Sequence, residues 1–212
     1  MANLKQTMEL HDLELPEDQR TKIKHYCQVL WELNKTLNLT RHTTYDKFVT
    51  RDLYDTIQLA KLIPEDKEVL DVGSGGGVPG VLLAIIRPDL KVTLAESVGK
   101  KAVALGQITE GIEVEVDVYH CRAEDLLADF RFDYTTARAV GPLVKLGTWF
   151  EEVWPSVGKL LALKGPNWPE EKKVADEAKV LDSVSLSVAS EYMTPGAQWK
   201  SYILEISSKK SR

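Results

Sequence analysis

The first third of the chain carries apolar side chains at the three- and four-residue spacing of amphipathic helices. A helix is predicted from Pro16, which suits a first helical position, and its apolar face consists of Ile23, Tyr26, Cys27, Leu30, Leu33 and Leu37. A second helix is predicted from Thr43 or Thr44 to just before Pro64, with Val49, Leu53, Ile57 and Ala60 facing inward. Residues 1–64 are therefore predicted to form an N-terminal helical extension.

From Lys67 onward the pattern changes to short apolar strands that alternate with helices. Strands are predicted at 69–72, 91–95, 113–120, 132–136 and 159–163, with helices at 78–87, 99–107, 143–153 and 170–181. The segments 184–188 and 202–206 alternate around a turn at Pro195-Gly196 and indicate an antiparallel pair. This alternation predicts one compact α/β domain over residues 65–212. A mostly parallel, Rossmann-like sheet with a C-terminal antiparallel hairpin is typical of class I methyltransferases.

Composition is that of an ordinary globular protein, with 43% hydrophobic and 28% charged residues and a formal net charge of −5. An acidic chain is not a general polyanion binder, so any contact with RNA requires a local basic face. Cys27 and Cys121 lie far apart, and the four histidines show no metal-binding spacing, so we expect neither a disulfide framework nor a metal site. We find no apolar leader and no run of 18 apolar residues, and expect a cytoplasmic protein without membrane contact.

Residues 69–80 read VLDVGSGGGVPG, with five glycines in eight positions directly after a predicted strand. Glycine this dense lets a ligand approach the backbone closely. A P-loop is excluded, because Val81-Leu82 stand where it requires Lys and Ser or Thr. A dinucleotide fingerprint can be placed on the later glycines, but it starts late after the strand and contains Pro79. The order hydrophobic, Asp, hydrophobic, Gly, x, Gly over residues 70–75 is that of a methyltransferase loop.

The acid in this loop favours a cofactor with a cationic amino acid end. S-adenosylmethionine (SAM) carries an ammonium and a sulfonium where NAD carries a pyrophosphate, so Asp71 can hold the ammonium directly or through water. Glu96 closes the second strand, 23 residues beyond Gly73, where a carboxylate can accept both ribose hydroxyls of either cofactor. Ala123 and Glu124 follow the third strand, where a methyltransferase loop meets the adenine or the chain caps the next helix.

The fourth strand ends at Arg138, on the side where a substrate would bind. The [DNS]-P-P-[YF] sequence of amino-group methylases is absent, and neither cysteine is placed like the nucleophile of a cytosine-C5 methylase. The remaining acceptors are an atom with its own lone pair, such as guanine N7, or a small hydroxyl or thiol. Guanine N7 needs no general base, so alignment and positive charge can do most of the catalysis, with Arg138 and Lys164 as the candidate residues.

Basic and aromatic residues near the strand ends are candidates for RNA contact. Lys164 precedes Trp168, and a cation for phosphate beside a ring for base stacking suits RNA, although Trp168 is equally explained as packing. The other candidate RNA-binding residues are Lys35, Arg51, Lys100 and Lys101. Together with the acidic net charge they predict cations gathered at the mouth of the pocket. No heptad or exposed apolar seam is visible, and we expect a monomer.

Several stretches, in order along the chain, resemble the motifs of one family. They are Leu33-Asn34-Lys35-x-x-Asn38-Leu39-Thr40, Arg51-x-x-x-Asp55-Thr56, the loop 71–80 with Arg87-Pro88, Glu96-Ser97-x-Gly99-Lys100-Lys101, Thr136-x-Arg138-Ala139 and Leu163-Lys164-Gly165. Over roughly residues 26 to 168 the chain resembles the bacterial small-subunit ribosomal RNA guanine-N7 methyltransferases, historically called glucose-inhibited division protein B.

The resemblance implies a SAM-dependent enzyme that methylates N7 of one guanine in the decoding region of 16S ribosomal RNA, as RNA or in an assembling small subunit. It implies cofactor contacts at Gly73, Val78, Glu96, Ala123, Glu124 and Arg138. The methyltransferase loop adds Asp71, Gly75 and Gly77 to the candidate cofactor-binding residues. The chain departs from the family pattern at Asp52, where His is usual, at Glu96, where Asp is common, and in a short segment 105–111.

Three alternatives to this function remain open on the sequence. A small-molecule methyltransferase explains the glycine loop equally well but leaves the rim cations unexplained. An NAD-dependent oxidoreductase would use the same ribose carboxylate. A non-catalytic RNA-binding module could have kept the fold.

Overall fold

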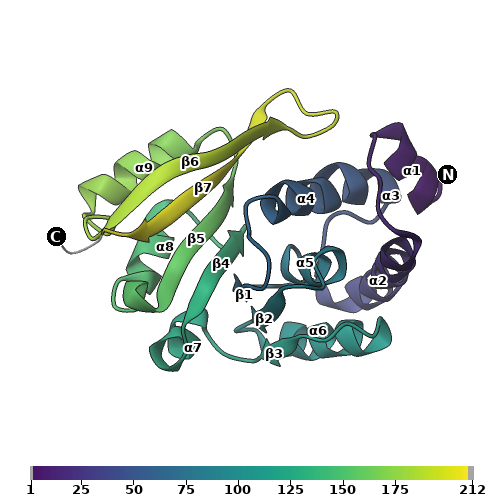
Figure 1. The fold of residues 1–212 in the computed structure, drawn as a ribbon, viewed down its shortest axis with the longest axis horizontal. Coiled ribbons are helices and arrows are strands. Elements are labelled where there is room, and N and C mark those ends of the chain that lie inside the picture. Colours follow the sequence, from purple (N-terminus) through teal and green to yellow (C-terminus); the bar gives the residue numbers. More distant parts are fainter. Residues whose placement is uncertain (1, 210–212) are drawn as a thin grey trace.

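The computed structural model describes residues 2–209, and its centre is a seven-stranded sheet with helices on both faces (Figure 1). The strand order is β3-β2-β1-β4-β5-β7-β6, with β1 to β5 parallel and β7 inserted antiparallel between β5 and β6. The strands are β1 Glu68–Val72, β2 Lys91–Ala95, β3 Asp117–Tyr119, β4 Phe132–Arg138, β5 Val157–Lys164, β6 Val184–Met193 and β7 Lys200–Ser208. The predicted fold class, with its C-terminal antiparallel pair, is confirmed.

The helices form two layers around this sheet. The helices α2, α4, α5 and α6 lie on one side of the sheet, and α7, α8 and α9 lie on the other (Figure 1). Their bounds are α1 Leu4–Leu10, α2 Glu17–Leu37, α3 Tyr45–Lys47, η1 Phe48–Leu53, α4 Tyr54–Ala60, α5 Gly80–Ile86, α6 Gly99–Gly111, α7 Ala123–Asp129, α8 Leu143–Phe150, η2 Trp154–Ser156 and α9 Trp168–Glu177. Among residues 2–209, no helix has both the length and the apolar character needed to cross a membrane.

Strand β5, which lies between β4 and β7, shows why the sheet is covered on both faces. Leu161 and Leu163 belong to the buried cluster on the side of α2 and α5, whereas Leu160 and Ala162 belong to the cluster beneath α8 and α9. Consecutive side chains of a strand point to opposite faces, so a continuous apolar run requires two covering layers.

The N-terminal helices share their core with the sheet. Leu30 of α2 and Phe48 of η1 are fully buried and lie in one cluster with Val69 of β1 and Leu82 of α5. The apolar face predicted from Ile23 to Leu37 therefore packs on the layer of helices that covers the sheet.

Two predicted elements differ in detail. The strand expected at 113–120 forms hydrogen bonds with β2 only over 117–119, because α6 runs on to Gly111 and Glu113 has a positive φ of 52°. The second helix consists of α3, a π-helical turn η1 and α4. A spacing of three and four residues does not distinguish a π-helical turn from an α-helix, so the pattern could not predict it.

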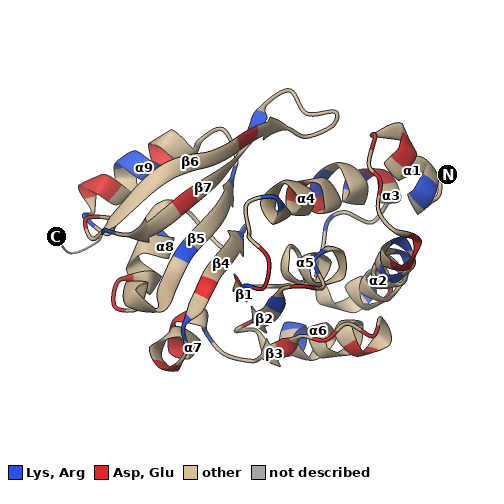
Figure 2. Ribbon diagram, viewed as in Figure 1, with Lys and Arg blue, Asp and Glu red and all other residues tan. Residues whose placement is uncertain are grey.

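Acidic and basic residues are interspersed along the elements rather than separated by sign (Figure 2). Helix α9, for example, carries both basic residues, drawn in blue, and acidic residues, drawn in red. The expected gathering of cations at a pocket mouth must therefore be a local feature, and it has to be sought at individual cavities.

Candidate functional site

The glycine-rich loop joins the carboxyl end of β1 to α5. Gly73, Gly75 and Gly77 have φ angles of +64°, +57° and +96°, a left-handed region that costs residues with a Cβ about 1–2 kcal/mol. The Gly73 amide donates to the Ala95 carbonyl at 2.8 Å and ties the loop to β2. A Cβ on Gly73 would lie 2.7 Å from Cγ1 of Val140, so only glycine fits at this position.

The Asp71 carboxylate lies beneath the loop and has no exposed surface. It accepts hydrogen bonds from the Thr136 hydroxyl at 2.8 Å and from the Gly80 amide at 3.1 Å. Burial raises the pKa of Asp71 to about 6, and the hydrogen bond from Thr136 opposes that rise. Asp71 therefore fastens the start of α5 to β4 and shapes the loop from below, and its expected contact with a cofactor ammonium, direct or through water, stays a prediction.

The Glu96 carboxylate, at the end of β2, is 5% exposed and also binds the loop. Its Oε2 accepts from the Gly75 amide at 2.9 Å, and its Oε1 accepts from the Val98 amide at 2.8 Å. Each carboxylate oxygen has a second acceptor position. Glu96 therefore links the loop to β2 while keeping the capacity to accept a ligand hydroxyl.

A cavity of about 230 Å³, here called the cofactor cavity, opens at the carboxyl ends of β1 and β2. This edge is where ligands bind in open α/β sheets. Four of the predicted residues line it: Gly73, Lys101, Ala123 and Glu124. Sequence reasoning missed the Trp149 ring from α8, which no local motif signals.

Three predicted loop residues, Gly75, Gly77 and Val78, are not among the residues that line this cavity. Gly75 and Gly77 shape the turn, and a Cβ on Gly77 would lie 2.6 Å from Cγ2 of Val81. Val78 packs against the core cluster beneath the loop. The bare backbone at Gly73, the Glu124 carboxylate and an aromatic wall suit a nucleoside with an amino acid tail, so the cavity fits SAM.

Cys121 also lines the cofactor cavity. Burial, together with the neighbouring Asp125 and Glu124 carboxylates, raises the pKa of the Cys121 thiol. The thiol therefore stays protonated near neutral pH, and a protonated thiol is a weak nucleophile.

A second cavity of about 520 Å³, here called the substrate cleft, adjoins the first, since Ala139 lines both. Its wall includes Arg138, Lys164, Asp55, Tyr192 and Trp199. Asp55 comes from α4 and Tyr192 from β6, so segments far apart in the sequence build this cleft.

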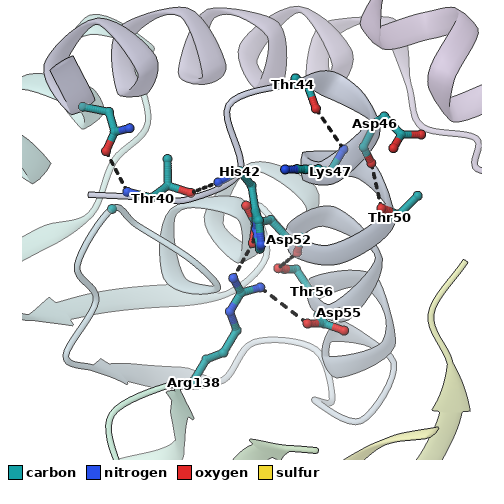
Figure 3. A network of polar contacts seen from close by, with 12 residues as sticks. Thr40, His42, Thr44, Asp46, Lys47, Thr50, Asp52, Asp55, Thr56 and Arg138 are labelled. Carbon is teal, nitrogen blue, oxygen red and sulfur yellow. Dashed lines mark hydrogen bonds and ion pairs between the residues drawn. The ribbon is translucent and has the colours of Figure 1, made fainter. Parts of the chain in front are cut away.

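The Arg138 guanidinium lies between two carboxylates, Asp52 and Asp55 (Figure 3). Burial lowers the pKa of Arg138, and the charges of both carboxylates more than offset this, so its pKa is raised overall. Asp52 also contacts Nδ1 of His42 at 2.9 Å. At Asp52, where His is usual in the family pattern, the chain thus carries a carboxylate that binds Arg138.

The Lys164 ammonium is largely buried, with 8% of its side chain exposed. It donates to the Gly141 carbonyl at 2.6 Å and to Oε2 of Glu171 at 2.7 Å. Trp168 packs on Tyr202, with ring centroids 6.0 Å apart, against the cluster beneath α8 and α9. Lys164 lines the cleft, whereas Trp168 packs against this buried cluster, as the packing alternative expects.

The remaining basic candidates differ in their surroundings. Arg51 lines the substrate cleft and also a groove of about 460 Å³, here called the basic groove, together with Arg41, Lys47 and His42. Lys35 pairs with Glu32 at 2.6 Å on the surface, and Lys100 is exposed at the start of α6. Over residues 2–209, no cluster of three or more His, Cys, Asp or Glu side chains could hold a metal ion.

Known proteins resemble this chain in sequence and in fold. The family model for rRNA small subunit methyltransferase G matches residues 19–199. The ribosomal RNA small subunit methyltransferase G of Rhodopirellula baltica is 48% identical over 191 residues, covering 90% of this chain and 83% of that protein. The protein of the same name from Thermobifida fusca is 40% identical over 158 residues, covering 74% and 65%.

Among solved structures, an O-methyltransferase from Bacillus cereus in complex with SAH has a TM-score of 0.61 at 14% identity, covering 95% of this chain and 96% of that one. At this identity the likeness shows the fold alone. The sequence matches confirm the predicted resemblance and SAM as cofactor, and they set aside the oxidoreductase and small-molecule alternatives. This chain belongs to the rRNA small subunit methyltransferase G family.

Proposed function

We propose that this protein transfers the methyl group of SAM to N7 of a guanine in the decoding region of 16S ribosomal RNA. The observation that carries the proposal is the shared wall at Ala139 between the cofactor cavity and the substrate cleft. The two cavities adjoin at Ala139, so a cofactor in one and an acceptor in the other would have their reacting groups next to each other there. Methyl transfer requires such an approach of donor and acceptor.

SAM supplies a methyl group on a sulfonium, which is a strong electrophile without further activation. The Gly73 backbone, Ala123 and Glu124 would hold the cofactor in its cavity, with the Trp149 ring beside them. Asp71 and Glu96 support the cofactor indirectly. Their carboxylates accept hydrogen bonds from the amides of Gly80 and Gly75 and so hold the loop in its conformation.

Guanine N7 has its own lone pair, so the protein needs no base to deprotonate it. The cationic groups on the cleft wall, Arg138 and Lys164, are bound to Asp52, Asp55 and Glu171. They therefore orient the acceptor as fixed hydrogen-bond donors and are not free charges for a phosphate. The chemistry of the site is alignment rather than acid–base catalysis.

The basic groove favours RNA as the carrier of this guanine. Arg41 and Lys47 are exposed there and Arg51 connects the groove to the substrate cleft. In a chain with a net charge of −5, a cluster of this kind next to the cleft suits a phosphodiester backbone. Trp199 in the cleft is 51% exposed and offers a ring on which a base can stack. The proposal includes that the enzyme is a monomer, that it is cytoplasmic, and that its substrate is the RNA or an assembling small subunit.

The test is methyl transfer from tritiated SAM to small-subunit RNA and to small subunits, both from cells that lack the protein. N7-methylguanosine is identified by reduction and aniline cleavage of the RNA. Label at any other atom, or only in a small molecule, would contradict the proposal. A non-catalytic RNA-binding module would bind this RNA and transfer no label.

The contribution of the basic groove is tested by reversing two of its charges, with Arg41→Glu and Lys47→Glu combined. The logarithm of the RNA affinity falls with the logarithm of the salt concentration, by about 0.7 per phosphate contact for single strands. The double variant should lower this slope by about 1.4 and leave SAM affinity unchanged. The matched control, Lys172→Glu with Lys173→Glu on α9, should keep the wild-type slope.

A further inference from the structure

One carboxylate on the wall of the substrate cleft is only partly engaged by the protein. Asp55 of α4 accepts the Tyr192 hydroxyl on Oδ1 at 2.8 Å, whereas its Oδ2 has only a long contact of 3.5 Å with Arg138. The side chain is 18% exposed, and it lines the cleft. Glu171, another carboxylate of the cleft wall, binds Lys164 and the Leu143 amide. Asp52 contacts His42 and Arg138 through Oδ1, and its Oδ2 has no hydrogen-bond partner among the described residues, but at 1% exposure Asp52 is closed to a ligand in the cleft.

The electrostatic surroundings of Asp55 favour a ligand that donates hydrogen bonds. Asp52 is 1% exposed and takes the closer contact with the Arg138 guanidinium, so it balances most of that charge (Figure 3). Burial raises the pKa of Asp55, although Arg138 and the Tyr192 hydroxyl oppose the rise. A buried carboxylate with an oxygen left for a ligand is stabilised by N–H groups placed against it.

The order of donor and acceptor on this wall matches one purine. Guanine presents the O6 acceptor followed by the N1–H and N2–H donors, whereas adenine presents an N6–H donor followed by the N1 acceptor. On the cleft wall, the Arg138 guanidinium offers N–H donors, and beside it the Asp55 carboxylate offers an acceptor oxygen. Guanine pairs with both groups at once, whereas adenine places donor against donor and lone pair against lone pair.

The same arrangement leaves the reacting atom free. A hydrogen bond to N7 would occupy the lone pair that attacks the methyl group. Contacts at N1, N2 and O6 hold the base by its other edge, so N7 can point toward the wall that the cleft shares with the cofactor cavity at Ala139.

We propose that Asp55 is the residue that selects guanine, with its Oδ2 accepting from N1–H and N2–H while Arg138 donates to O6. The inference rests on the proposed function for the assignment of the cleft to the acceptor base. It adds a specificity-determining carboxylate from the N-terminal helices. A site built around a hydrogen bond rejects ligands that lack the partner strongly, because its own polar group is then left unpaired.

The experiment measures binding of three mononucleotides to the full-length protein saturated with S-adenosylhomocysteine, by saturation-transfer NMR. GMP carries both donors, IMP lacks the 2-amino group and AMP has the opposite pattern. Wild type should bind IMP about tenfold more weakly than GMP, the loss for one hydrogen bond to a charged group, and AMP more weakly still. Asp55→Asn should lose the preference for GMP over IMP, while Asp129→Asn, an exposed carboxylate on α7, should keep it.

Equal binding of GMP and IMP by the wild type, or no binding of GMP at all, overturns the inference without any variant. An Asp55→Asn protein that keeps the wild-type ratio overturns it as well. Failure here is separable from failure of the proposed function. Guanine N7 labelling of the RNA without a GMP preference removes only the role of Asp55, and a GMP preference without labelling removes the methyl transfer.

Discussion

Replacing Asp71 by Asn should change how stability depends on pH, because the carboxylate is fully buried under the glycine loop. Its pKa is about 6 in the folded protein, whereas an aspartate ordinarily has a pKa of 3.8, so burial raises the pKa by about 2. The folded state therefore keeps a proton that the unfolded chain has already lost between these two values. The contribution of this group to stability is fully present below about pH 3 and is lost as the pH rises through about 6.

Each pKa unit corresponds to 1.36 kcal/mol, so the loss amounts to about 3 kcal/mol. Urea unfolding of wild type and Asp71→Asn is measured at pH 4 and pH 7, and the difference between the two proteins cancels titrations that they share. Asn cannot ionise, and at pH 4 part of the full loss has already occurred, so wild type should lose about 2.4 kcal/mol relative to the variant over this range. Parallel profiles for the two proteins, or a wild type that gains stability with pH relative to the variant, would refute the reasoning.

Three further substitutions test the loop and the core. Gly73→Ala should weaken SAM binding at least tenfold, as measured by calorimetry. The added Cβ would meet Val140, and the positive φ alone would cost about 1–2 kcal/mol of strain. The control variant Gly106→Ala in α6, where a Cβ meets nothing, should bind SAM normally. Tyr26→Phe removes the donor that reaches the Gly76 carbonyl at 2.7 Å and should cost about 1–3 kcal/mol in urea unfolding; an unchanged midpoint would mean that water replaces the hydroxyl. Phe150→Ala empties a fully buried position in α8 and should cost about 3–5 kcal/mol, and a loss below 1 kcal/mol would contradict the packing described.

The elements that the sequence predicted well are those with a strong local period. Helix α2 and strand β2 follow their predicted ranges closely, because one repeats every three to four residues and the other is a short apolar run between turns. The glycine loop was also recognisable, since Gly73 and Gly77 must adopt a positive φ. Such signals depend only on neighbours in the chain.

The substrate cleft could not be predicted in this way. Its wall combines Asp55 from the N-terminal helices with Tyr192 and Trp199 from the C-terminal segment, which carries no diagnostic motif. Asp71 shows the same limit for a single side chain. A carboxylate at a strand end can turn toward a ligand or beneath its own loop, and the partners that decide this, Thr136 and Gly80, lie 65 and 9 positions away.

The insertion of β7 between β5 and β6 has a consequence for how the protein is made. During synthesis β5 leaves the ribosome with one edge unpaired, and that edge acquires its partner only after Lys200–Ser208 has followed. An open edge of this kind can pair with other chains. A premature stop just ahead of Lys200 would therefore produce an aggregation-prone chain, even though the glycine loop and the first five strands would all be present.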